Sequence, residues 1–317
     1  FWFNRRCADY TGRSVHDLEA EGWSSVLHPS DIERVRSDWF GSVASGNPYE
    51  SIYLLRRADG SYRHFLARAE PLRSGEGHIT HWFGTSTDIT ERVAAERFND
   101  YLVRLGEELR TAADAADAKA RIVRLLGEAL QADRVHYSDP DPARREARVT
   151  DEYLALGVGS VAGTHKFSRE LLEYYSRGEP VVVSDHRKHP AFAHDSKRPN
   201  FAKLPVRAIL DVPLVRDGQL VAVLSVHQTE PRDWTAQEIE LAVATAQRSW
   251  DLLERLRAED RLRLSEEQFR TTAEAVPGML FVTDGGGHNR YVNTYYRDYT
   301  GKSAEELSGD GWAEIVH

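Results

Sequence analysis

The sequence predicts an α+β fold in which antiparallel sheets with flanking helices are joined by long helices. Three observations support this class: strand-like segments joined by tight turns, helical segments on either side of them, and one amphipathic stretch over residues 235–276. The chain has 317 residues, of which 41% are apolar, so it is long enough to form two or three globular domains.

Residues 1–93 are predicted to form the first domain. It opens with short helices, the first of them ended by Gly12, and a longer helix starts at Pro29. The pair Asp59-Gly60 is typical of a hairpin turn between two strands. Strands are expected over 49–57, 62–72 and 78–87. The last of these strands leads directly into a helix.

Residues 94–256 are predicted to form a second domain of a different type. Helical segments occupy 94–132, a further helix is expected over 168–177, and the polar loop 184–204 follows it. Strands are expected over 134–137, 147–156, 180–183, 206–215 and 219–227. Strands enclosed by helices at both ends are typical of an α+β domain.

The segment 235–276 is predicted to be one long helix or two helices that meet near Leu264. Thr235 and Glu238 form a capping box at its start, and Pro277-Gly278 cannot continue it. Its apolar stripe with charged flanks favours a parallel homodimer, in which the stripe packs against a second copy. The alternative is that the stripe packs on its own domain. The stripe consists of Ile239, Val243, Ala246, Trp250, Leu253 and Leu256.

An internal repeat relates the two ends of the chain. Residues 4–28 align with residues 293–317 without a gap, with identities at Asn4/Asn293, Asp9/Asp298, Tyr10/Tyr299, Thr11/Thr300, Gly12/Gly301, Ser14/Ser303, Leu18/Leu307, Gly22/Gly311, Trp23/Trp312 and His28/His317. Residues 268–317 are therefore predicted to be a second copy of the first domain, joined by a helical linker over 257–267. The first copy is expected to lack its beginning and the second its end.

The first copy resembles a PAS domain with a C-terminal PAC motif. The segments that carry the resemblance are Asn4 with Asp9-Tyr10-Thr11-Gly12, Trp23 with His28-Pro29-Ser30-Asp31, Arg57-Ala58-Asp59-Gly60-Ser61, and Asp88-Ile89-Thr90-Glu91-Arg92. Some light-sensing PAS domains bond flavin through a cysteine motif. Arg5-Arg6-Cys7 does not match that motif, so no flavin-cysteine adduct is expected.

The middle section resembles a GAF domain, in particular those that precede bacterial sensor histidine kinases of the HWE group, and more distantly the phytochromes. The resemblance rests on residues 178–185, 206–215 and 218–227, and on Pro231-Arg232-Asp233-Trp234. The only cysteine, Cys7, lies in the first copy, so covalent bilin attachment is not expected. The resemblance leaves the identity of any cofactor or small-molecule ligand unknown.

The pocket of a GAF domain lies between its sheet and the loop that covers it, which makes polar residues there candidate ligand contacts. These candidates are Asp185, Phe192, Arg207, Asp211 and His227. A metal or haem site is a further possibility, because His186, His189 and His194 lie close to Asp185 and Asp195. A solvated polar loop is the commoner arrangement for such residues, so no metal site is predicted.

No catalytic motif is recognisable in this span, and its long helix lacks the phosphorylatable histidine of a histidine kinase. The resemblances imply a non-catalytic sensory and relay region, with helices that pass signals to a C-terminal histidine kinase and, through it, to a response regulator. The alternatives are the input region of a diguanylate cyclase or phosphodiesterase, or a ligand-free dimerisation spacer. The net charge of −9 excludes non-specific nucleic-acid binding, and no apolar run is long enough for a membrane span, so a cytoplasmic location is expected.

Overall fold

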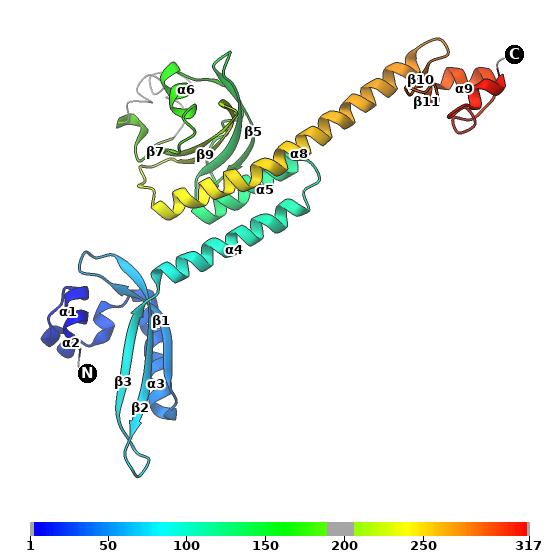
Figure 1. Ribbon diagram of the computed structural model, residues 1–317. Coiled ribbons are helices and arrows are strands. Elements are labelled where there is room, and N and C mark those ends of the chain that lie inside the picture. The colour runs from blue at the N-terminus through cyan, green and yellow to red at the C-terminus, as the bar shows by residue number, and fades with distance from the viewer. Residues whose placement is uncertain (1–2, 189–205, 316–317) are drawn as a thin grey trace. The chain divides into compact units, whose positions relative to one another are not determined.

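The computed structural model describes residues 3–188 and 206–315, and it divides the chain into two compact units. The first unit is Phe1–Arg104 and the second is Leu105–His317, so the boundary lies within helix α4. Figure 1 shows the elements of both units. The sheets are antiparallel, and helices precede and follow the runs of strands, which confirms the predicted α+β class.

The first unit is a three-stranded antiparallel sheet in the order β1-β2-β3 with helices packed against it. Alternate residues Phe65, Ala67 and Ala69 of β2 face the buried side chains Leu18 and Val35 of the helices. The predicted strands are confirmed to within one residue at each end. The elements are α1 (Arg5–Thr11), α2 (Val15–Glu21), α3 (Ile32–Ser45), β1 (Tyr49–Arg56), β2 (Tyr62–Arg73), β3 (Ile79–Asp88) and α4 (Thr90–Arg110).

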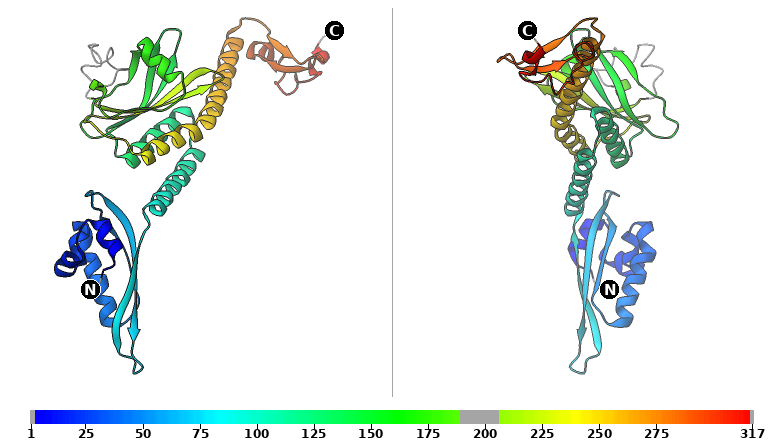
Figure 2. Two further views of the ribbon diagram at one scale, coloured as in Figure 1. Left: turned by 60° about the vertical axis from the view of Figure 1, so that its left-hand side comes forward. Right: turned by 90° about the vertical axis from the view of Figure 1, so that its right-hand side faces the viewer.

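The second unit contains a six-stranded antiparallel sheet in the order β6-β5-β4-β9-β8-β7. Helices α5 and α8 pack side by side on its outer face, and α6 lies on the inner face (Figure 1, Figure 2). The elements of this domain are α5 (Ala115–Leu130), β4 (Arg134–Asp141), β5 (Glu146–Leu154), β6 (Gly163–Lys166), α6 (Arg169–Tyr175), β7 (Val181–Val183), β8 (Ala208–Arg216), β9 (Gln219–Gln228) and α8 (Ala236–Ala275).

Two strand predictions for this sheet were wrong. The strand predicted over 134–137 is longer than expected and continues to Asp141 as β4, because Ser138–Asp141 pair with β5. The short edge strand β6 was not expected at all, since Gly163–Lys166 has neither apolar alternation nor β-branched residues beyond Thr164. The side chains of this longer β4 alternate between the two faces of the sheet.

Helix α8 is continuous over Ala236–Ala275, so of the two predicted alternatives the structure shows one long helix. The capping box of Thr235 and Glu238 at its start is confirmed. Its predicted dimer stripe is corrected in part: Ala246, Trp250 and Leu253 are buried within the domain itself. They are covered because α8 lies on α5 and on the sheet, where Tyr137 and Ser249 form a hydrogen bond of 2.8 Å.

The two copies of the repeat share their first helix and its caps, whereas the second helix of the first copy, α2, has a turn as its counterpart over residues 304–310. After α8 the chain forms a hairpin of β10 (Phe281–Thr283) and β11 (Asn289–Val292), followed by α9 (Thr294–Thr300). Asn293 caps α9 as Asn4 caps α1, and both helices end at a glycine with φ of 68°, Gly301 and Gly12. The hairpin turns over Asp284–Gly287, where the carbonyl of Asp284 accepts a hydrogen bond from Gly287 N.

The packing of α8 predicts that Leu253→Ala destabilises the second domain by about 2–5 kcal/mol, because a fully buried leucine leaves a cavity. The matched control is Leu264→Ala on the exposed part of the same helix, which should change the free energy of unfolding by less than about 0.5 kcal/mol. Urea unfolding followed by tryptophan fluorescence measures both. Equal effects of the two variants would show that Leu253 does not anchor α8.

Candidate functional site

One face of the six-stranded sheet carries a group of buried polar side chains, which we call the inner-face cluster: Arg134, His136, Asp211, Ser225 and His227. The strand register pairs Arg134 with His227, His136 with Ser225, and Ser225 with Asp211. Residues directly opposite each other in antiparallel strands project from the same face. Tyr137, the residue after His136, projects from the other face towards α8. The cluster therefore lies on the face opposite α5 and α8.

Asp211 lies at the centre of the cluster and is only 2% exposed. The hydroxyl of Tyr175, on α6, donates a hydrogen bond of 2.5 Å to Asp211 Oδ2. His227 Nε2 lies 3.7 Å from Oδ1, and this second oxygen has no hydrogen-bond partner in the described part of the chain. Asp211 and His227, both candidates from the sequence, are thus brought together. Tyr175 was not among the candidates from the sequence, because no local pattern shows that this residue of α6 faces Asp211 on β8.

His136 packs edge to face against His227, with the ring centroids 4.9 Å apart. Burial lowers the pKa of His136 well below its usual value, and the neighbouring His227 and Arg134 lower it further. His136 is therefore a neutral imidazole at physiological pH. Its Nδ1 and the Nδ1 of His227 are buried, and neither has a hydrogen-bond partner among the described residues.

Arg134 is the most deeply buried charged side chain of the cluster, at 1% exposed. Its Nη2 donates a hydrogen bond of 2.5 Å to the carbonyl of Gly159, whereas Nε has no partner in residues 3–188 or 206–315. Burial lowers the pKa of this guanidinium. Neither Arg134 nor His136 was a candidate from the sequence. The signal that could have found them is the alternation of polar Arg134, His136 and Ser138 with apolar Val135 and Tyr137.

Asp185 and Arg207, the other predicted pair, form a bidentate ion pair with N–O distances of 3.1 and 2.8 Å. Hydrogen bonding from Arg207 lowers the pKa of Asp185 to about 2. Among the described residues, no hydrogen bond or ion pair joins this pair to Asp211 or His227. The fifth candidate, Phe192, lies outside the described residues.

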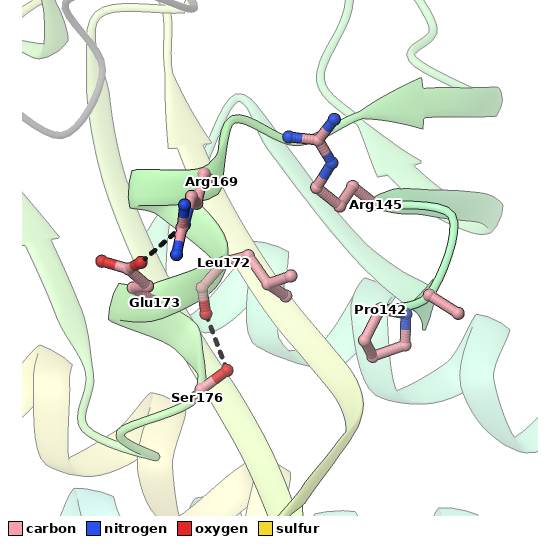
Figure 3. Close-up of a pocket in the computed structure, with 7 residues that line it drawn as sticks. Pro142, Arg145, Arg169, Leu172, Glu173 and Ser176 are labelled. Atoms are coloured by element: carbon pink, nitrogen blue, oxygen red, sulfur yellow. Dashed lines mark hydrogen bonds and ion pairs between the residues drawn. The ribbon is translucent and has the colours of Figure 1, made fainter.

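A separate pocket of about 550 Å³ lies between α6 and the turn that joins β4 to β5 (Figure 3). It is lined by Pro142, Ala143, Arg145, Arg169, Leu172, Glu173 and Ser176. Arg169 and Glu173, which pair with each other along α6, are both exposed to solvent. None of the inner-face cluster lines this pocket. We place the candidate site at the cluster, because unpartnered buried polar atoms indicate a ligand and satisfied exposed ones do not.

The histidine-rich loop gives limited information on metal binding. His186 is buried beside the Asp185–Arg207 pair, and its backbone N–H donates to the carbonyl of Arg207. His189, His194 and Asp195 lie outside the described residues. Across the ranges 3–188 and 206–315, no group of three or more histidine, cysteine or acidic side chains is arranged to hold a metal ion. No helix in these ranges combines the length and apolar character that crossing a membrane requires.

Comparison with protein-family models assigns the three-stranded and the six-stranded sheets. Residues 1–86 match the model described as PAS fold, and residues 114–250 match the model described as GAF domain. The chain carries a PAS domain followed by a GAF domain. The three-stranded sheet belongs to the PAS domain and the six-stranded sheet to the GAF domain. The boundaries predicted at residues 93, 256 and 267 stay predictions.

Relatives of this PAS-GAF chain include a histidine kinase and a sensor. It is 38% identical over 96 residues to the peroxide stress-activated histidine kinase mak1 of Schizosaccharomyces pombe, covering 30% of this chain and 6% of that protein. It is 23% identical over 310 residues to the methyl sulfide methyltransferase-associated sensor of Methanosarcina acetivorans, covering 93% of this chain and 30% of that protein. The chain therefore spans less than a third of the length of either relative.

Among solved structures, the GAF domain from a phosphoenolpyruvate-protein phosphotransferase of Coxiella burnetii is similar to part of the chain. Its sequence is 23% identical, the match covers 54% of this chain and 98% of that domain, and the TM-score is 0.44.

The Asp185–Arg207 ion pair predicts a specific pH dependence of stability. Because the folded carboxyl has a pKa of about 2, below the unfolded value near 3.9, the pair stabilises the fold above about pH 4. That contribution is lost as the pH falls through about 2. Asp185→Asn should therefore lower the melting temperature near neutral pH, and its difference from the wild type should disappear towards pH 2. A difference that stays constant from pH 7 to pH 2 would contradict this assignment.

Proposed function

We propose that this chain is the sensory and relay region of a cytoplasmic bacterial sensor histidine kinase. In this proposal a small molecule binds at the inner-face cluster of the GAF domain and changes how α8 packs on the sheet. The changed helix then passes the signal to a C-terminal kinase, which phosphorylates a response regulator. The similarity to sensor proteins supports the proposal, and one observation on β4 carries it.

Strand β4 contacts the candidate site with one face and α8 with the other. Arg134 and His136 belong to the inner-face cluster, whereas Tyr137 bonds to Ser249 of α8. Two residues further, Asp139 Oδ1 accepts a hydrogen bond of 2.6 Å from Arg257 of α8. Its Oδ2 accepts one of 3.0 Å from Lys119 of α5. A ligand that shifts β4 therefore acts on the attachment of α8 directly, provided that it binds the two arrangements with different affinity.

We infer that the segment after α8 is the first part of a second PAS domain. The sequence repeat supports this, as do the matching helix caps and the matching helix ends at Gly12 and Gly301. In the first copy Tyr10 and Trp23 pack into the core beneath the sheet. Their counterparts Tyr299 and Trp312 are exposed here.

We further propose that the chain forms a parallel homodimer through the C-terminal part of α8. Every residue of Arg261–Arg270 is exposed, so the domain itself does not cover this part of the helix. Leu262 and Phe269, seven residues apart, lie on one helix face with the smaller Ala258, Ser265 and Thr272 between and beside them. This spacing is typical of a short coiled-coil seam. It replaces the predicted seam further up α8, three of whose residues are buried in the GAF domain.

The relay predicts that Arg257→Gln loosens the C-terminal part of α8. A partly exposed ion pair contributes roughly 0.5–1 kcal/mol, so amide hydrogen exchange after residue 257 should accelerate by about two- to fivefold. Arg255→Gln is the matched control, because among the described residues Arg255 pairs only with Glu259 of its own helix, at 3.9 Å and in solvent. Equal amide exchange rates after residue 257 in the two variants would show that Asp139 does not hold α8 in place.

The seam predicts that Leu262→Glu converts the dimer into a monomer, since it buries two like charges at the centre of the interface. Leu264→Glu places the same charge on the opposite side of the helix and should leave the dimer intact. Light scattering coupled to size-exclusion chromatography and native mass spectrometry measure the mass of each. A wild-type monomer, or the same mass for both variants, would contradict the seam; a dimer without any bound small molecule would favour a spacer.

A further inference from the structure

The inner-face cluster contains two opposite charges that lack a charged partner. Arg134 has no carboxylate within 4.0 Å in the described part of the chain, and its one recorded hydrogen bond is to the carbonyl of Gly159. Asp211 accepts a hydrogen bond from the neutral hydroxyl of Tyr175, and its Oδ1 has no hydrogen-bond partner within residues 3–188 and 206–315. Buried charges in proteins are normally paired or bonded on all sides, because leaving water is costly for them.

The neighbouring acidic residues are already occupied. Glu152, on β5, accepts a hydrogen bond of 3.0 Å from the backbone N–H of Val161. Asp133 accepts two hydrogen bonds from Thr229, of 2.7 and 2.6 Å. Both acids attract Arg134 at longer range without pairing with it. The guanidinium Nε therefore has no hydrogen-bond acceptor among the described residues, and an anion would supply one.

Asp211 lacks a hydrogen-bond donor at Oδ1 among the described residues, whereas Arg134 lacks an acceptor at Nε. His227 Nε2, at 3.7 Å, is too far from Oδ1 for a hydrogen bond. The free oxygen thus accepts a donor, and an ammonium group is the donor that would also balance its charge. The two free Nδ1 atoms of His136 and His227 lie on the same sheet face as these charges, and each offers one further hydrogen bond.

We propose that the cluster binds a small zwitterion, with its carboxylate at Arg134 and its ammonium group at Asp211, as in a free α-amino acid. The backbones of β4 and β8 lie two strand spacings apart, roughly 10 Å, and side chains fill part of that span, which suits a molecule of this size. The histidine rings lie between the two charges and select the ligand's side chain. This inference rests on the proposed function, because it names the chemical class that the GAF domain senses.

Isothermal titration calorimetry of the whole chain with each common L-amino acid tests the proposal. At least one amino acid should bind, while the amine that lacks its carboxylate and the acid that lacks its amine should each bind at least about tenfold more weakly. This comparison uses only the wild-type chain, so it does not depend on a variant that folds. Failure of every amino acid to bind would overturn the proposal.

Two variants test whether Arg134 and Asp211 bind the two charged groups of the ligand. Arg134→Gln and Asp211→Asn, whose folding is checked by circular dichroism, should each weaken binding of that amino acid by at least about tenfold. Arg148→Gln removes a charge from an exposed site on β5 and should leave binding unchanged. Wild-type affinity in either cluster variant would overturn the proposal.

Native mass spectrometry of the chain as purified separates this inference from the proposed function. A bound mass that is an amino acid supports both. A bound mass of another chemical class, together with no amino-acid binding, overturns the zwitterion but leaves small-molecule sensing in place. The absence of any bound mass and of any amino-acid binding would count against both.

Discussion

The attachment of α8 to the outer face of the GAF sheet through β4 is the constraint on which the rest of the structure depends. A strand places successive side chains on opposite faces, so one short segment can belong to two environments at once. In β4, Arg134 and His136 are committed to the polar inner face, while Tyr137 and Asp139 are committed to the helices. Because the backbone of a paired strand moves as a unit, the two environments are mechanically joined.

Features that depend on a few neighbouring residues could be predicted from the sequence. Helix caps are of this kind: the capping box of Thr235 and Glu238 and the glycine end at Gly12 need only local geometry. What packs against the apolar face of α8 could not be predicted in this way. The periodicity of Trp250 and Leu253 shows that this face is apolar, but a second copy and the domain's own sheet satisfy that requirement equally well. Only the tertiary packing decides between them.

The candidate site was half predictable for a related reason. Asp211 stands out in the sequence as a charged residue within an apolar strand, so its place in a candidate site could be predicted. Arg134 and His136 alternate with apolar residues, which is also the pattern of a strand with one face in water. Their burial follows from the pairing of β4 with β9 and β5, between strands far apart in sequence. Tyr175 is positioned by the packing of α6, which no local pattern encodes.

The length of α8 has a geometric consequence. The helix is anchored to its domain up to Arg257, and residues 258–275 continue beyond that anchor. Those residues form a rigid arm of roughly 27 Å at 1.5 Å per residue, so a tilt of about 10° at the anchor displaces the far end by about 5 Å. A small tilt of α8 at Arg257 thus displaces the end of the helix by about the pitch of one helical turn. The displacement at the end of this arm is proportional to its number of residues. Inserting or deleting helical residues there would change the size of the displacement and would also rotate the segment that follows about the helix axis.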